Sequence, residues 1–281
     1  MKLQNKVVLV TGASSGIGMG FAIRAAKDGA TVLLAARRKE KLEEVKKQVE
    51  ELGGKAEVFP TDVADKSQVK QLFLDATKDG RLIDMVFNNA GIGFVGNIYD
   101  LPADEIEKVL DVNVKGMIMV AKYAAEVMVR QNFGHIIFCS SLAGLITLPQ
   151  WSVYVASKWA ITGFADSIRP ELKKFNVKIT TLHPGAVTTE FFEPDKANIE
   201  ISKMGKALTI DEVAEYVYNA TFTDKKRIVI PGTSQMFSSV YRFFPGLAEK
   251  MVANMAKDIE YTERAKEDEP DFSYIKSSKP E

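Results

Sequence analysis

The chain has 281 residues, of which 46% are apolar and 26% are charged, values ordinary for a soluble globular protein. Its 37 basic residues balance 37 acidic ones, which excludes the basic excess typical of a nucleic-acid-binding protein. One cysteine, Cys139, and two histidines, His135 and His183, exclude an internal disulfide and a His-based metal cluster. We therefore expect no nucleic-acid partner, no metal and a reducing, cytoplasmic environment.

No stretch reaches the roughly 18 apolar residues of a membrane-spanning helix, so we expect no transmembrane segment. The first half of the chain instead alternates short apolar runs with helical patterns. The runs are typical of strands covered on both faces of a parallel sheet, and they lie at 6–10, 31–36, 56–60, 83–89 and 135–141. The helical patterns between them lie at 16–28, 38–52, 66–78 and 104–130.

The second half continues the alternation with a helix at 152–174, a strand at 177–182, a helix at 211–221 and a strand at 227–230. Pro170 interrupts the first of these helical patterns and is expected to kink it. Strands that alternate with helices imply right-handed crossovers. We predict an α/β fold: a doubly wound (Rossmann-type), mostly parallel seven-stranded sheet with helices on both faces.

No linker rich in Gly, Ser or Pro divides the chain, so we predict one domain over 1–232 and a C-terminal extension over 233–281. Residues 188–209 are long enough to form a lid rather than a turn. The aromatic and Met-rich stretch 236–257 is predicted to be a helical cap or a subunit contact, with a membrane or other partner contact as the alternative. Residues 262–281 are predicted to be a mobile polar tail.

A glycine-rich turn follows the first strand in "VVLVTGASSGIGMGFA" (7–22). Gly12, Gly16 and Gly18 are placed where side chains would obstruct the turn or a close-lying pyrophosphate, and the helix that starts near Gly16 presents free N–H groups to that anion. The spacing differs from Gly-x-Gly-x-x-Gly, and no Gly-Lys-Ser/Thr of a P-loop follows. The turn therefore predicts a dinucleotide site, with a glycine-rich turn without ligand as the alternative.

The end of the second strand indicates which dinucleotide is bound. An acidic residue there often holds the ribose 2′-OH of NAD. This chain reads "LLAARRKE" and has Arg37 and Arg38 in that region. Two guanidiniums suit a 2′-phosphate, so we predict NADP(H), with NAD less favoured. The alternative is that both arginines only decorate the start of a helix.

Six stretches occur in the order and at the spacing of one family: "TGASSGIG" (11–18), "NNAG" (88–91), "VNVKG" (112–116), "SSLAG" (140–144), "YVASK" (154–158) and "HPGAVTTEF" (183–191). On these motifs the chain resembles the short-chain dehydrogenase/reductase family, in its single-domain subtype, over about residues 5–230. The resemblance implies an NADP(H)-dependent oxidoreductase that passes a hydride between nicotinamide and a carbonyl or secondary alcohol. Residues 1–232 would then be a dinucleotide-binding and catalytic domain.

The resemblance makes Tyr154 the acid/base of that reaction and Lys158 its neighbour. Residues four apart share one face of a helix, which puts the ammonium beside the phenol and within reach of the nicotinamide ribose. Because a nearby positive charge favours the phenolate, we expect the pKa of Tyr154 to fall from its usual value of about 10. Ser141 is preferred over Ser140 as the hydroxyl that holds the substrate oxygen. Asn113 is either the anchor for a water in a proton relay or a structural amide in a kinked helix.

The resemblance also implies cofactor contacts. Asp62 would meet the adenine amino group, Val187 would use its backbone, and Thr189 is preferred over Thr188. The predicted cofactor residues are Gly12, Ser14, Ser15, Gly16, Ile17, Gly18, Arg37, Arg38, Asp62, Val63, Asn89, Ala90, Gly91, Tyr154, Lys158, Pro184, Gly185, Val187 and Thr189.

The expected substrate is a small hydrophobic carbonyl or alcohol, because the predicted pocket walls are apolar: Phe94, Leu145, Trp151, Phe191 and Phe192. The helices at 104–130 and 152–174 form the usual subunit contacts of the family, which implies a homodimer or homotetramer. Two other functions are considered. A sugar-nucleotide epimerase would need a larger C-terminal domain. A non-catalytic dinucleotide sensor or scaffold is disfavoured by the intact set Asn113, Ser141, Tyr154 and Lys158.

Overall fold

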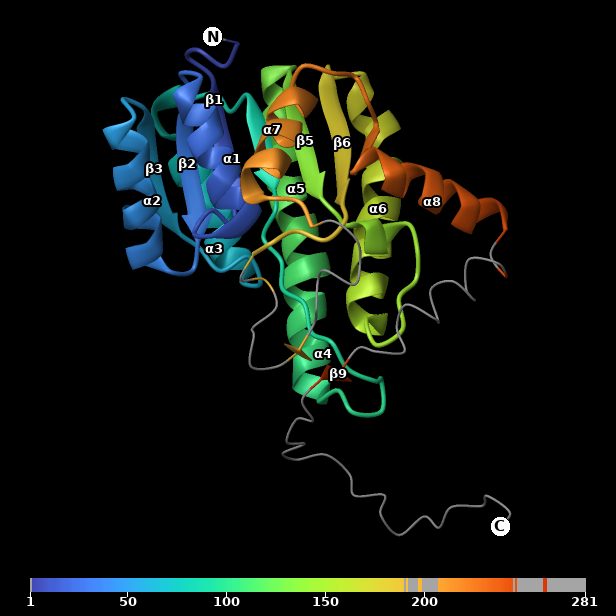
Figure 1. The fold of residues 1–281 in the computed structure, drawn as a ribbon. Coiled ribbons are helices and arrows are strands. Elements are labelled where there is room, and N and C mark those ends of the chain that lie inside the picture. Colours follow the sequence, from blue (N-terminus) through green and yellow to red (C-terminus); the bar gives the residue numbers. More distant parts are fainter. Residues whose placement is uncertain are drawn as a thin grey trace, which may run out of the picture.

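The computed structural model describes residues 2–189, 191, 197–198, 207–244, 246 and 260–261. Its centre is a seven-stranded sheet with the strand order β3-β2-β1-β4-β5-β6-β8 (Figure 1). Every neighbouring pair in this sheet is parallel. The predicted doubly wound fold is therefore confirmed, and the sheet is parallel throughout rather than mostly so.

The elements follow one another as strand and helix along the chain. The strands of the sheet are β1 Val7–Thr11, β2 Thr31–Ala36, β3 Lys55–Pro60, β4 Met85–Asn88, β5 Gly134–Cys139, β6 Val177–Pro184 and β8 Arg227–Ile230. The helices are α1 Gly16–Lys27, α2 Lys39–Glu51, α3 Lys66–Ala76, α4 Ala103–Leu110, α5 Met117–Gln131, α6 Ser152–Lys173, α7 Ile210–Ala220 and α8 Gly232–Phe243. A short antiparallel pair, β7 Ala197–Asn198 and β9 Glu260–Tyr261, was not predicted.

Two hydrophobic layers enclose the sheet. Side chains of α1, α2 and α7 pack on one face, around Phe21 and Val45. Side chains of α3, α5 and α6 pack on the other, around Phe73 and Met128. Because both faces are covered, β1, β2 and β4 are almost entirely apolar and the other strands largely so, which is the pattern by which they can be recognised in the sequence.

The predicted helix at 104–130 is interrupted. A π-helical segment, Asp111–Gly116, separates α4 from α5. A Cβ on Gly116 would lie 2.8 Å from the carbonyl oxygen of Val63, so the chain passes close to the segment after β3. The buried amide of Asn113 lies in the same segment, and π segments of this kind are frequent at functional sites. Helix α6, in contrast, runs through Pro170 without a break.

Several predicted segments lie wholly or partly outside the described residues. Of the predicted lid at 188–209, residues 190, 192–196 and 199–206 are outside, as is the predicted tail at 262–281. Val187, directly before the lid segment, and Leu208, near its end, form a parallel bridge. Of the predicted cap at 236–257, α8 accounts for the part up to Phe243. Among the described helices, none combines the length and the apolar content needed to span a bilayer.

Candidate active site

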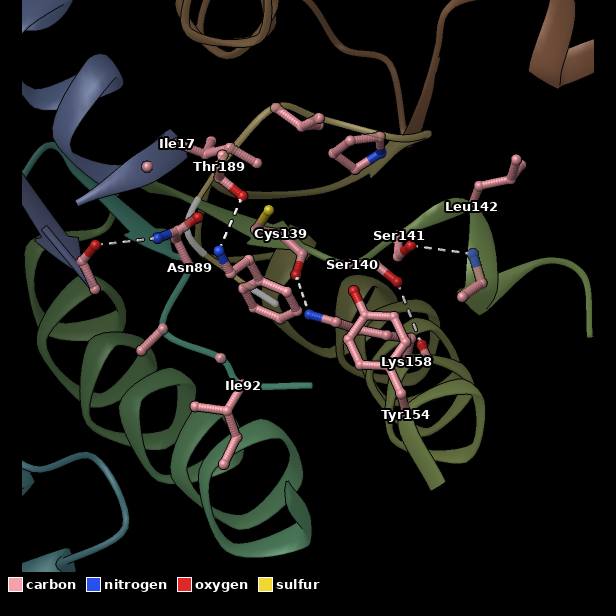
Figure 2. A pocket seen from close by; sticks show the side chains of 18 of the residues that line it. Ile17, Asn89, Ile92, Cys139, Ser140, Ser141, Leu142, Tyr154, Lys158 and Thr189 are labelled. Carbon is pink, nitrogen blue, oxygen red and sulfur yellow. Dashed lines mark hydrogen bonds between the residues drawn. The ribbon is translucent and has the colours of Figure 1, made fainter. Parts of the chain in front are cut away.

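The carboxyl ends of the strands open into one cavity of about 740 Å³. Its wall is formed by the segments that follow β1, β2, β3, β4, β5, β6 and β8. Figure 2 shows Tyr154 and Lys158, from α6, facing Cys139 and Ser141 at the end of β5. Open α/β sheets bind their ligands at this edge, so the cavity is the candidate site.

The turn between β1 and α1 needs glycine for its backbone. Gly12 has a φ of +66° and Gly16 a φ of +56°, both in the left-handed region that glycine adopts without strain. Both line the cavity, and α1 begins there without a side-chain cap from Ser15. A helix start of this kind leaves N–H groups and a positive dipole end for an anion. Gly18 is not on the wall; its Cβ would lie 2.3 Å from the carbonyl oxygen of Gly12, so glycine here allows α1 to pack on the turn.

Arg38 reaches back from the start of α2 to the glycine-rich turn. Its Nη2 donates to Ser15 Oγ at 2.9 Å and to Ser14 Oγ at 3.1 Å. Arg37 lines the cavity beside it. Two guanidiniums and two hydroxyls thus surround the part of the cavity at the end of β2, where a dinucleotide site for NAD would carry a carboxylate. This donor set suits a phosphate group.

Polar groups of β1 and β4 hold the turn to the sheet. Asn89 Nδ2 donates to the carbonyl oxygen of Thr11 at 3.1 Å, and the backbone N–H groups of Asn89 and Ala90 donate to Thr11 Oγ1 at 2.9 and 3.1 Å. Asn88 Nδ2 donates to the carbonyl oxygen of Met117 at 2.7 Å. Asn89 therefore lines the cavity but uses its amide to position the turn. Sequence reasoning missed Thr11 and Asn88, although Asn88 lies inside the "NNAG" stretch.

Tyr154 and Lys158 lie one turn apart on α6. The Ser141 hydroxyl, which accepts from the Ala143 N–H at 3.1 Å, faces the Tyr154 phenol (Figure 2) and favours a lower pKa of that phenol. The phenol ring packs edge-on between Trp151 and Phe191, with ring centroids 5.7 and 5.8 Å away. Lys158 Nζ lies 5.5 Å from the centroid of the Tyr154 ring and donates to the carbonyl oxygen of Cys139 at 3.0 Å. The phenol is therefore held in one orientation, with an ammonium beside it.

Burial is the main cause of the pKa shifts of Tyr154 and Lys158. Burial raises the pKa of Tyr154 above its usual value, and the nearby Ser141 hydroxyl offsets only part of the rise. Burial likewise lowers the pKa of Lys158. The pKa of Tyr154 was expected to fall, but in this structure it rises. The free-energy cost of removing the phenolate from water is larger than the stabilisation that its neighbours provide. The neutral phenol, a proton donor, is the favoured form.

Asn113 lies behind the cavity wall rather than on it. Its Nδ2 donates to the carbonyl oxygen of Ile92 at 2.7 Å and to Ser157 Oγ at 3.1 Å, and its Oδ1 accepts from the Ile92 N–H at 2.8 Å. Ser157 Oγ in turn donates to the carbonyl oxygen of Tyr154 at 2.7 Å. The amide therefore joins the segment after β4 to the helix that carries Tyr154.

His183 and Ser140 support the cavity from behind. His183 Nδ1 donates to the carbonyl oxygen of Ser141 at 3.0 Å, and its Nε2 lies 2.9 Å from Thr181 Oγ1. Burial lowers the pKa of His183 to about 4, so the ring is neutral. The Ser140 hydroxyl donates to the carbonyl oxygen of Lys158 at 3.3 Å. Ser140 is thus engaged with α6, whereas the Ser141 hydroxyl faces the phenol (Figure 2).

The structure brings the predicted site residues together around this cavity. All of the predicted catalytic and cofactor residues line it except Gly18 and Asn113, which lie behind the wall. Asp62 and Val63 reach it from the end of β3, and Pro184, Gly185, Val187 and Thr189 reach it from the end of β6.

The end of the cavity nearest Tyr154 is apolar. Trp151 and Phe191 line it as expected, but Phe94 and Leu145 are not among the wall residues. Their places are taken by others, which sequence reasoning did not single out: Ile146, Leu148 and Phe237. Phe192 lies outside the residues that the structure describes. In the loop after β5, the residues on either side of Thr147 therefore line the cavity. Helical or strand periodicity does not predict which residues of a loop do so.

Comparison with known proteins shows which family the sequence and its fold belong to. The family model described as short chain dehydrogenase matches residues 6–200. An uncharacterised oxidoreductase of Listeria innocua is 38% identical over 195 residues, which cover 69% of this chain and 79% of the relative.

Solved structures agree. A short-chain type dehydrogenase/reductase of Mycobacterium marinum matches with a TM-score of 0.76 and 32% identity, over 83% of this chain and 96% of the other. An alcohol dehydrogenase of the archaeon Thermococcus sibiricus, solved with 5-hydroxy-NADP, matches with a TM-score of 0.71 and 26% identity, over 81% and 96%. Other similar structures carry NAD. The chain belongs to the short chain dehydrogenase family of oxidoreductases.

Proposed function

We propose that the protein is an NADP(H)-dependent oxidoreductase that reduces a small hydrophobic carbonyl compound to a secondary alcohol, with Tyr154 as the proton donor. One observation carries this proposal: a buried phenol that faces Ser141 and lies next to Lys158, in a cavity that is also lined by Arg37, Arg38 and the glycine-rich turn. The same residues would serve the reverse oxidation, with the phenolate of Tyr154 as the base.

The residues that line the cavity support a phosphorylated dinucleotide as the cofactor. The start of α1 and the turn at Gly12 and Gly16 would hold the pyrophosphate, because glycine leaves backbone N–H groups within reach. Arg37 and Arg38 would hold the 2′-phosphate, and Lys158 the nicotinamide ribose. When bound, the reduced cofactor supplies the hydride. Because similar proteins carry either NAD or an NADP analogue, the preference for NADP(H) is a proposal from Arg37, Arg38 and the absence of an acid at positions 36–38.

The side chains of the site bind the carbonyl and supply its proton. The hydroxyls of Ser141 and Tyr154 would both donate to the carbonyl oxygen, which increases the positive charge on its carbon. As negative charge develops on that oxygen, Tyr154 transfers its proton to it. Lys158 then stabilises the phenolate that remains, since the ammonium is next to the ring. Asn113 acts as a positioning residue through Ile92 and Ser157.

Three further predictions accompany this function. The single domain over 1–232 with an extension over 233–281, and the homodimer or homotetramer, stay predictions from the sequence. So does the cytoplasmic location. The alternative function, a dinucleotide sensor without catalysis, has no support in the site, where Tyr154, Ser141 and Lys158 are held together.

The test is NADPH oxidation by the purified protein with a panel of apolar ketones and aldehydes. Replacement Tyr154→Phe removes the donated proton and should lower kcat by at least about 10²-fold, the low end of general-acid contributions. Tyr216→Phe, an exposed tyrosine on α7, is the matched control and should leave kcat unchanged. Oxidation of NADPH that Tyr154→Phe leaves intact would contradict the proposal, as would a wild-type protein that binds NADPH and reduces no carbonyl.

A further inference from the structure

Helix α8 forms one wall of the cavity on its substrate side. It follows β8 after one residue, and Thr233, Ser234 and Phe237 from its first half line the cavity. A Cβ on Gly185 would lie 3.7 Å from Ser234 Oγ, so the helix begins against the turn that follows β6. Figure 1 shows the rest of α8 extending away from the sheet. None of its side chains is fully buried, so its position depends on few contacts.

One of these contacts ties α8 to the loop between β5 and α6. Tyr241 and Thr147 are hydrogen-bonded through their hydroxyls at 2.5 Å. Phe237 lies four residues before Tyr241 and therefore on the same face of the helix. On the loop, Ile146 and Leu148 flank Thr147 and line the same cavity. The hydrogen bond thus holds Phe237 opposite the loop that also carries Ser141.

The chemistry of this end of the cavity is apolar. Among the described residues, the loop after β5, the start of α6, residue 191 and α8 contribute Leu142, Ile146, Leu148, Trp151, Phe191 and Phe237 to the wall, together with the hydroxyls of Ser141, Thr233 and Ser234. The charged wall residues are Arg37, Arg38, Asp62 and Lys158, of which only Lys158 is near the phenol. An apolar substrate group in this space would be removed from water and would make dispersion contacts. A charged group would find no opposite charge there. An uncharged, apolar group is what this end accepts.

Helix α8 lies outside the part of the chain that matches the family model, which ends at residue 200. The family match therefore does not include Phe237 and Tyr241. In "MFSSVYRFF" (236–244), only Phe237 is on the cavity wall, whereas Met236 is 71% exposed. Two adjacent apolar residues thus differ in whether they face the cavity.

We propose that Phe237 determines the size of the apolar group that the cavity accepts beside the reacting carbonyl, and that the Tyr241–Thr147 hydrogen bond keeps it in place. This inference rests on the proposed carbonyl reduction. A smaller side chain at 237 lengthens the apolar end of the cavity, and a larger one shortens it. One methylene group in a hydrophobic pocket changes discrimination by roughly 10-fold or more, so the effect is measurable.

The experiment uses the full chain, NADPH and linear methyl ketones from 2-butanone to 2-decanone. Two quantities are measured for each ketone: kcat/KM from NADPH oxidation, and the Kd for the NADPH-loaded protein from nicotinamide fluorescence. Phe237→Ala should move the best-bound ketone toward longer chains and raise the relative kcat/KM of the longest by about 10-fold. Phe237→Trp should move it toward shorter chains. Met236→Ala replaces the neighbouring exposed residue and should change neither the order of the kcat/KM values nor the order of the Kd values.

Tyr241→Phe keeps the ring and removes the hydrogen bond to Thr147. Because α8 is then held less firmly, KM should rise several-fold for all of the ketones while kcat and the Kd for NADPH stay within twofold. A rise in the Kd for NADPH as well would contradict this part, since it would show a general loss of structure.

The outcomes separate this inference from the proposed function. Opposite shifts in the two Phe237 variants support it. If all variants reduce the ketones with the same order of preference, the inference is overturned and the proposed function stays intact. Opposite shifts in Kd without NADPH oxidation support the role of Phe237 and overturn the proposed reduction. Failure of any ketone to bind overturns the inference, because the cavity would then not hold an apolar carbonyl compound.

Discussion

At the scale of single residues, Arg38 and Tyr154 define the two ends of the site. Arg38 bonds both serines of the glycine-rich turn, so its guanidinium is fixed although the residue is exposed. Tyr154 is buried, neutral and enclosed by two aromatic rings. In the proposed function, Arg38 would bind the phosphate that distinguishes NADP(H) from NAD(H), and Tyr154 would donate the proton.

Replacement Arg38→Ala should separate the two cofactors. A charge-assisted hydrogen bond contributes about 1.5–3 kcal/mol, so the Kd for NADPH should rise by about 10-fold or more, while the Kd for NADH changes little. Lys39→Ala removes an adjacent exposed cation and is the control. Both affinities are measured by nicotinamide fluorescence. Equal weakening of NADPH and NADH would show that Arg38 only supports the turn.

Two buried histidines make the stability depend on pH. Burial lowers the pKa of both His135 and His183 to about 4, from an unfolded value of 6.5. The unfolded chain therefore binds more protons between pH 6.5 and 4, and the free energy of unfolding falls as the pH falls through this window. Below about pH 4 both states are protonated at these rings, and this contribution levels off.

His135→Gln tests the effect away from the active site. His135 Nε2 bonds Thr180 Oγ1, and an amide can keep that bond. The lowered pKa implies that the wild-type protein loses about 2 kcal/mol more than the variant between pH 7.5 and pH 5. Urea unfolding of both proteins at these two pH values measures the difference. An identical loss in both would mean that His135 is not a buried neutral ring.

At the scale of elements, the π segment at Asp111–Gly116 is the feature that the sequence does not predict. Its side chains continue the helical pattern of 104–130, so periodicity indicates one long helix. The interruption depends on the contacts of Asn113 with Ile92 and Ser157, which are distant in sequence. An amide within an apolar helical pattern marks Asn113 in the sequence as a candidate site residue. Its hydrogen-bond partners become visible only in the fold.

Replacement Ser157→Ala tests the junction between this segment and α6. It leaves one N–H of the buried Asn113 amide without its acceptor, and such a loss costs about 1–3 kcal/mol. Ser167→Ala on the same helix is the matched control, because its hydroxyl also bonds a backbone carbonyl of α6 but is exposed. The control should change the free energy of unfolding by less than about 0.5 kcal/mol. Equal effects of the two replacements in urea unfolding would argue against a specific role for Ser157.

At the scale of the whole molecule, the sheet could be predicted almost completely. Its strands are continuous apolar runs bounded by turns, because both faces are covered, and each observed strand overlaps its predicted run. The part of the cavity wall formed by Gly12 and Gly16 could also be predicted, since both residues lie in the local motif 11–18. The apolar end could not, because Ile146, Leu148 and Phe237 meet there through tertiary contacts of a loop and a distant helix.

The central claim is that this cavity binds a nicotinamide dinucleotide and prefers the phosphorylated form. The most direct test is the thermal midpoint of the purified protein during separate titrations with NADPH and NADH. A ligand at 100 times its Kd adds about 2.7 kcal/mol, which corresponds to a rise of roughly 5 °C for a chain of this size. We expect NADPH to raise the midpoint at concentrations at which NADH does not. A larger rise with NADH would contradict the roles of Arg37 and Arg38, and no rise with either at millimolar concentration would contradict the proposed enzyme.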